Sequence, residues 1–338
     1  MAAHGDAWPT LGLADWQDTY ATLHRWTQIL GKTRLALAPM VNHWWQVTLR
    51  VSARGLTTGA IPYGTGEFDV EFDLIAHEVV IRTSAGTSER IPLASGTVAA
   101  FHQHYFSALR RLGIEVTIRP LAVEIPETIW LDSDTTHREY DPDWANRFLL
   151  ALQAAERAFS EFRGGFLGKV SPVQFFWGSF DLAVTRFSGR AAPTHPGGAP
   201  HCPDYVMIEA YSQEVSSAGF WAGDARFPEP AFYSYAYPEP EGFRSARVEP
   251  DDARYLQALG EFVLPYAAVR SARSPQREVM AFLNTTYEAA AELAGWDRAT
   301  LEIAKVASAP KPVEEAHDRN LRTSQPGRRA PARRGAEQ

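Results

Sequence analysis

The chain has 338 residues, of which 45% are hydrophobic and 22% are charged, and its net charge at pH 7 is −7. This composition excludes a disordered chain, a collagen and a disulfide-stapled scaffold, and the length allows two domains or one large one. The single cysteine, Cys202, cannot form an internal disulfide, so we expect a reducing compartment. No stretch reaches roughly 18 apolar residues and the N-terminus lacks a signal-peptide pattern, so we expect a cytoplasmic protein without a membrane span.

Positive charge is concentrated near the C-terminus. Residues 306–338 carry a net charge of +3, which leaves −10 on residues 1–305. The last residues are rich in Ala, Pro and Arg and show no apolar period, so we predict a disordered basic tail over 305–338. We also predict a disordered N-terminus over 1–7. The acidic body argues against nucleic acid as a partner.

Two parts of the chain show the same order of predicted elements: an opening helix, a Gly-Lys pair, a strand that begins in aromatic residues, and a closing helix. In the first part these elements lie at 15–30, 31–32, 43–47 and 98–113, and in the second part at 142–162, 168–169, 175–179 and 279–295. We expect Gly31 to cap the first helix and Asp141 to cap the helix that opens the second part. The chain has only four lysines, and two of them, Lys32 and Lys169, occupy matching positions.

From this order we predict an α+β fold of two diverged tandem halves, 8–130 and 138–304. Each half is expected to be an antiparallel sheet with helices packed on one face. In the first half, residues 67–73 alternate acidic with apolar side chains, which is typical of a half-buried antiparallel strand. We interpret the acidic row as a solvated face paired with Arg50 or Arg82.

The second half is rich in aromatic residues between positions 175 and 243. This stretch holds 15 aromatic residues in 69, against 12% for the whole chain. A period of two places Trp177, Asp181 and Thr185 on one face of a predicted strand, and it gives Tyr233 and Tyr235 a common face on another. Such an aromatic wall is typical of a packed layer or of a ligand-binding surface.

A loop over 188–203 carries four prolines and three glycines together with two histidines. Long, stiff loops in compact domains are often functional. His195, His201 and one carboxylate, Glu209 or Glu214, form a set that one divalent metal ion can use, although their spacing fits no standard metal site. Nothing in the sequence identifies a base that would activate Cys202 as a nucleophile.

Several runs of residues are similar to those of one known family. They lie at 8–11, 16–19, 22–24, 42–45, 171–173, 175–181, 195–200 and 214–221. On these runs the chain resembles an uncharacterised bacterial family known as domain of unknown function 5996, over about 8–304. The resemblance implies no established activity. It leads us to expect a histidine at position 213, where this chain has Gln213.

The candidate cleft lies on the second half or at the junction of the two halves. The catalytic candidates are Asp181, His195 and Glu214. The candidate ligand-binding residues are His43, Trp45, Trp177, Glu209, Tyr211, Trp221, Tyr233 and Tyr235. Three functions stay open: binding or processing of a small polar ligand in an aromatic cleft, a metal-dependent enzyme, and a non-catalytic oligomerising or partner-binding protein. The sequence leaves both catalysis and oligomeric state undecided.

Overall fold

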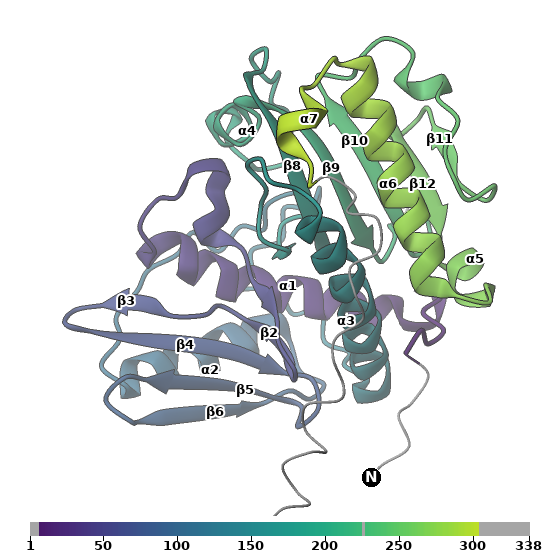
Figure 1. The fold of residues 1–338 in the computed structure, drawn as a ribbon. Coiled ribbons are helices and arrows are strands. Elements are labelled where there is room, and N and C mark those ends of the chain that lie inside the picture. Colours follow the sequence, from purple (N-terminus) through teal and green to yellow (C-terminus); the bar gives the residue numbers. More distant parts are fainter. Residues whose placement is uncertain (1–6, 225–226, 304–338) are drawn as a thin grey trace, which may run out of the picture. The chain divides into compact units, whose positions relative to one another are not determined.

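The fold is α+β, with helices and two antiparallel sheets of six strands each (Figure 1). The structure is a computed structural model and describes residues 7–224 and 227–303. Each predicted half contains one of the two sheets, and the boundaries and common origin of the halves stay predictions. The tail predicted over 305–338, and all but one residue of the N-terminus predicted over 1–7, lie outside the described residues.

In the chain, one helix precedes the strands of the first sheet and another helix follows them. The elements of this part are α1 (Leu13–Leu37), the 3-10 helix η1 (Asn42–Val47), β1 (Arg50–Val51), β2 (Gly55–Thr57), β3 (Ile61–Tyr63), β4 (Gly66–Asp73), β5 (Glu78–Thr83), β6 (Ser88–Pro92) and α2 (Val98–Arg111). The strands are ordered β1-β2-β4-β5-β6, with β3 paired to β4. Both helices contact the sheet, α1 at β3 and α2 at β6, and they also pack on each other.

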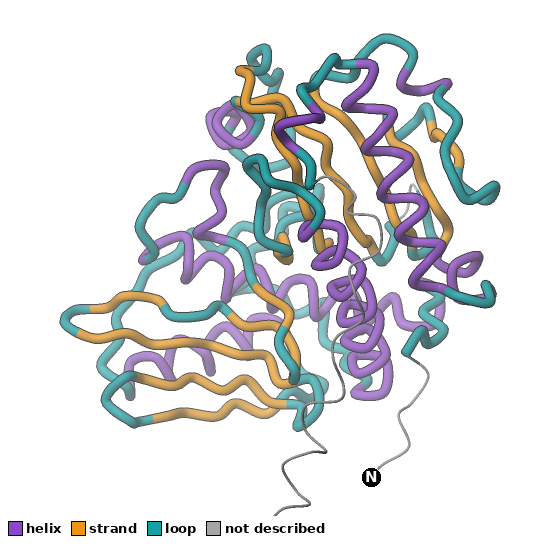
Figure 2. Tube along the Cα trace, in the orientation of Figure 1, coloured by secondary structure: helices purple, strands orange, loops and turns teal. Residues whose placement is uncertain are grey.

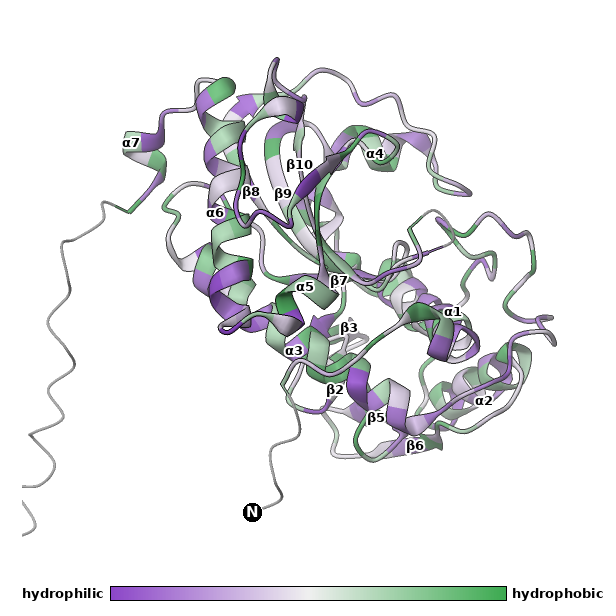
Figure 3. Cartoon of the chain, turned by 90° about the vertical axis from the view of Figure 1, so that its right-hand side faces the viewer, coloured by the Kyte–Doolittle hydropathy of each residue, from purple (hydrophilic) through white to green (hydrophobic). Residues whose placement is uncertain are grey.

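The second sheet has the order β11-β12-β10-β9-β8-β7. Its part of the chain comprises α3 (Pro142–Gly164), β7 (Gln174–Phe176), β8 (Asp181–Ala191), α4 (Asp204–Ala210), β9 (Gln213–Trp221), β10 (Ala231–Tyr237), the 3-10 helix η2 (Phe243–Ser245), β11 (Arg254–Leu256), β12 (Glu261–Pro265), α5 (Tyr266–Ser271), α6 (Pro275–Leu293) and α7 (Arg298–Leu301). The helices α3 and α6 pack on one face of β8, β9 and β10. Hydrophilic and hydrophobic residues are mixed along α6, as amphipathic packing requires (Figure 3).

The two sheets meet at one edge of each. The strands form two separate groups in Figure 2, and these groups are joined by a bridge between Leu49 and Phe175. The amide of each residue donates to the carbonyl of the other, at 2.9 and 2.8 Å. The helix α3 contacts both β1 and β8, so it packs against both sheets. The side chain of Asp141 caps α3 by accepting from two amides of its first turn, as predicted.

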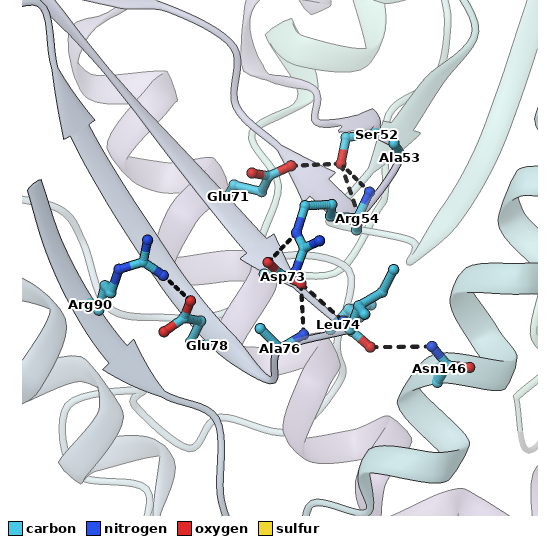
Figure 4. Close-up of polar contacts among 12 residues, drawn as sticks. Ser52, Ala53, Arg54, Glu71, Asp73, Leu74, Ala76, Glu78, Arg90 and Asn146 are labelled. Atoms are coloured by element: carbon cyan, nitrogen blue, oxygen red, sulfur yellow. Dashed lines mark hydrogen bonds and ion pairs between the residues drawn. The ribbon is translucent and has the colours of Figure 1, made fainter. Parts of the chain in front are cut away.

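The acidic row predicted on residues 67–73 lies on β4 and is only partly solvated. Asp69 and Glu71 pair with Arg82, as the sequence suggested for this arginine. Asp73 pairs with Arg54 and is 3% exposed, so the end of the row is buried. Figure 4 shows this end of the sheet, where Ser52 donates to Glu71 and Asp73 accepts from the turn that follows the strand.

Three local predictions are wrong, and contacts from distant parts of the chain explain the first two of them. Gly31 does not cap a helix, because α1 continues to Leu37. Residues 43–47 form a 3-10 helix rather than a strand, with His43 and Trp44 in the left-handed region. The aromatic strand expected over 175–179 ends at Phe176, and a tight turn separates it from β8.

The indole ring of Trp177 explains why position 31, inside a helix, is a glycine. A Cβ atom at position 31 would overlap this ring, so the missing side chain lets the ring lie against α1. The ring is held in place because its Nε1 donates to the carbonyl of Val47 at 2.7 Å. The glycine is therefore required for packing between the two parts of the chain.

Gly31→Ala tests this packing. An alanine in a helix interior usually stabilises by about 1 kcal/mol relative to glycine. Here we expect a loss of about 1–3 kcal/mol in the free energy of unfolding, because the new methyl group displaces the Trp177 ring. Urea denaturation measures the change. Gly164→Ala, at the end of α3 with nothing within 4 Å of its Cβ position, is the control and should be neutral.

Candidate functional site

A cavity of about 440 Å³ lies against the sheet face that α3 and α6 do not cover. Its walls come from both parts of the chain: alternate residues of β8, β9 and β10, the turn 177–179, the helices η1 and α4, and the segment 119–124. The predicted residues that line it are His43, Trp45, Trp177, Asp181, His201, Tyr211, Tyr233 and Tyr235. Most of the remaining lining is apolar or aromatic, which is typical of a small-molecule site.

Asp181 is the most enclosed carboxylate of this wall, at 5% exposed. It accepts hydrogen bonds from the hydroxyl groups of Tyr233 and Ser179. Burial raises the pKa of Asp181, and the two hydroxyl donors oppose the rise. Tyr233 reaches Asp181 across β9 because Gly219 lies beneath its ring, where any side chain would overlap it.

A second row of hydroxyl groups crosses the same sheet face. Thr185 on β8 and Ser217 on β9 are opposite each other in register, and their oxygens lie 2.8 Å apart. Tyr235 on β10 lies opposite Ser217 and is hydrogen-bonded to Tyr211, with 2.6 Å between the two phenol oxygens. Burial raises the pKa of Tyr235 to about 12, so these phenols stay protonated at neutral pH. They can donate or accept hydrogen bonds without adding charge to the wall.

Glu124 is a second carboxylate of the cavity, and the sequence analysis missed it. Its segment is held by Gln28 of α1, whose side-chain amide donates to the carbonyl of Val123 at 2.9 Å and accepts from the Val123 amide at 3.1 Å. The Glu124 carboxylate lies against Gly178, and a Cβ atom added at this position would overlap the carboxylate. The described hydrogen bonds and ion pairs include none to this carboxylate.

The environment of Glu124 favours its protonated form. Desolvation by the groups packed around its carboxyl, followed by the charge of Asp181, raises the pKa of Glu124 from 4.5 to about 7, although the residue as a whole is exposed. A carboxyl group with a pKa close to 7 is suited to give or accept a proton at neutral pH. Two carboxyl groups with raised pKa values in one aromatic cavity are a pattern typical of functional sites.

Strained backbone is concentrated around the cavity. Among the described residues, six that are not glycine have a positive φ. Four of them line the cavity, namely His43 (59°), Trp44 (58°), Glu124 (62°) and His201 (55°). Such conformations cost of order 1–3 kcal/mol each and persist where the surrounding structure enforces them, most often at functional sites.

His43 is held by three contacts from the second part of the chain. Its Nδ1 donates to the carbonyl of Ala210 at 2.9 Å, so its Nε2 is the acceptor of the bond from Lys169. Its backbone amide donates to Glu209 at 2.9 Å. Burial lowers the pKa of His43, which keeps the ring neutral. Glu209 therefore positions His43 from outside the lining.

Four other predicted residues do not line the cavity, namely His195, Glu209, Glu214 and Trp221. Glu214 pairs with Arg190, and it lies on the opposite sheet face because residues of β9 alternate and Val215 and Ser217 face the cavity. The ring of Trp221 stacks on Phe227 beyond the end of the lining. The structure therefore does not bring Glu214 to Asp181 as a second catalytic group.

The three predicted metal ligands do not come together. The ring of His195 stacks on Tyr211, and its Nδ1 accepts from the Gly197 amide at 3.0 Å. His201 donates to the carbonyl of Pro126 at 3.3 Å, while Glu209 holds His43. Among residues 7–224 and 227–303, no group of three or more His, Cys, Asp and Glu side chains is arranged to hold a metal ion. The proline-rich loop directs its two histidines to different neighbours, and Glu209 lies on α4.

Comparison with known proteins agrees with the resemblance seen in the sequence. The model of a family of unknown function (DUF5996) matches residues 8–303. The chain belongs to DUF5996. Comparisons with curated proteins and with solved structures give no match. In this DUF5996 chain, no helix of the described residues is long and apolar enough to cross a membrane.

Glu124→Gln tests the electrostatics of the DUF5996 cavity. A folded-state pKa of about 7 against an ordinary 4.5 means that Glu124 contributes stability below pH 4.5 and that this contribution is lost as the pH rises to 7. We therefore expect Glu124→Gln to become progressively more stable than the natural protein between these pH values, with a constant difference above pH 7. Urea midpoints across this range measure the difference.

Glu241→Gln, an exposed glutamate of the second part, is the control for the loss of one negative charge. An advantage of Glu124→Gln that does not change with pH would contradict the raised pKa of this carboxyl group.

Proposed function

We propose that the cavity binds a small organic molecule with a largely apolar body, and that the ligand presents a polar group to Asp181 and Glu124. The observation that carries the proposal is the combination of a 440 Å³ aromatic cavity with strained backbone at four of its lining residues. A packed interface between layers would not need a hollow of this size or backbone held in unfavourable conformations.

The direction of the aromatic side chains supports a ligand rather than a partner protein. Tyr233, Tyr235 and Trp177 face the cavity, and Trp177 is only 5% exposed. Their rings offer flat surfaces on which an apolar or aromatic ligand can stack. A side chain as buried as that of Trp177 is not accessible to a second chain.

The two carboxyl groups suggest how the cavity can act on its ligand. Asp181 is fixed by two hydroxyl donors and suits a positioning or charge-stabilising role. The Glu124 carboxylate has no hydrogen-bond partner among the described residues and has a pKa of about 7, so it is the group we assign to proton transfer. Ligand binding is the first step of this proposal, and proton transfer by Glu124 is the second.

A cavity-filling substitution tests ligand binding. Ala183 is near the start of β8 and faces the cavity, so Ala183→Phe fills part of the space. The probe is 2-naphthamide, a flat, neutral aromatic amide, titrated by isothermal calorimetry. We expect the natural protein to bind it and Ala183→Phe to bind at least about tenfold more weakly, because the new ring occupies the ligand's place.

Ala191→Phe, the same change at an exposed position at the end of β8, is the matched control and should bind normally. Circular dichroism checks that both variants are folded. Equal affinity of the natural protein and a folded Ala183→Phe variant would show that the probe binds elsewhere and would contradict the proposal.

A further inference from the structure

Lys32 is a buried amine that lines the cavity. It projects from α1, is 6% exposed, and has its ammonium 5.6 Å from the centre of the Trp177 ring. The hydrogen bonds and ion pairs of the described residues include none made by this ammonium. Among the described residues, the aromatic ring of Trp177 takes the place of a hydrogen-bond partner or counter-ion for this ammonium.

Lys169, which follows α3 in the second part, has polar partners, in contrast to Lys32. Its ammonium donates to His43 and, at 3.1 Å, to Gln213. Lys169 is thus satisfied by protein groups, and Lys32 is not. The difference indicates that Lys32 has a role other than stabilising the fold.

The charges around Lys32 are unfavourable to an ammonium. Burial, followed by the charge of Arg119, lowers the pKa of Lys32 to about 8, so the amine is still largely protonated at pH 7. The other titratable neighbour is the thiol of Cys202. Burial raises the pKa of this thiol to about 11, so it carries no charge at pH 7. A buried ammonium without a counter-ion costs several kcal/mol, and a bound anion would remove much of this cost.

Arg119 adds a second positive charge to the same wall. It is exposed, lines the cavity, and has no hydrogen bond or ion pair among the described residues. A single anionic group placed between the two side chains could accept from the ammonium and from the guanidinium. Lys32, Arg119, Asp181 and Glu124 all line the cavity, and among the described residues neither carboxylate forms an ion pair with Lys32 or Arg119.

We propose that Lys32, assisted by Arg119, forms a subsite for the carboxylate of the ligand, whose apolar body stacks on Trp177. This inference rests on the proposed function and narrows it: the ligand is an apolar, preferably aromatic, carboxylic acid. The cationic subsite orients the molecule so that its other end lies toward Asp181 and Glu124.

The test compares two probes of the same shape. 2-Naphthoate carries a carboxylate where 2-naphthamide carries a neutral amide, and both are titrated by calorimetry at pH 7 into the full chain. We expect the natural protein to bind naphthoate at least about tenfold more tightly than naphthamide, because its carboxylate accepts a charge-assisted hydrogen bond from the ammonium.

Lys32→Met keeps the length of the side chain and removes the charge. This variant should lose about tenfold or more in naphthoate affinity and bring the affinity ratio of naphthoate to naphthamide close to one. Arg119→Gln, at an exposed position that does not threaten folding, should show a smaller loss of the same kind. Arg110→Gln, exposed on α2, controls for the loss of one positive charge and should leave both affinities unchanged.

The outcomes separate the two proposals. If naphthamide binds the natural protein and naphthoate binds no more tightly, the carboxylate subsite is wrong and the cavity proposal stands. If Lys32→Met and Arg119→Gln both bind naphthoate normally, the subsite is wrong as well. If neither probe binds the natural protein, the ligand-binding proposal fails and the subsite fails with it.

Discussion

The cavity depends on the contact between one face of α1 and the turn at 177–178. His24 donates from Nε2 to the carbonyl of Gly178 at 2.9 Å, and burial lowers the pKa of this histidine to about 4, so the ring is a neutral donor. Gly31 admits the Trp177 ring, and Gln28 holds the backbone of Val123. Because these side chains recur at helical spacing, a single helix face positions two walls of the cavity.

Around this contact the chain maintains groups that a purely structural core would exclude. Lys32 is a buried ammonium, Asp181 is a buried carboxylate, and Glu124 has a raised pKa and left-handed backbone. Each of these features lowers the stability of the folded chain. The extensive aromatic core shared by the two sheets and their helices offsets this cost. Proteins commonly sacrifice stability in this way at sites that must recognise a ligand.

Local pattern was sufficient for the residues on the regular strands. The period of two placed Asp181 and Thr185 on one face, and Tyr233 and Tyr235 on one face, and all four line the cavity. Glu214 shows the limit of this reasoning, because the sequence does not reveal which face of β9 turns inward. A shift of one residue moves a strand's side chains to the other face, and that choice is made by packing of α3 and α6.

The sequence by itself determined the α+β class, the two sheets and the capped helix at Asp141, because these depend on periodicity and on residues close together in the chain. Membership of DUF5996 follows from the long runs of residues that match that family. Only the tertiary structure decided that Gly31 lies inside a helix and that Glu124 enters the cavity. It also decided that Lys32, unlike Lys169, lacks a polar partner among the described residues. These features depend on contacts between segments about a hundred residues or more apart, for which a single sequence carries no local signal.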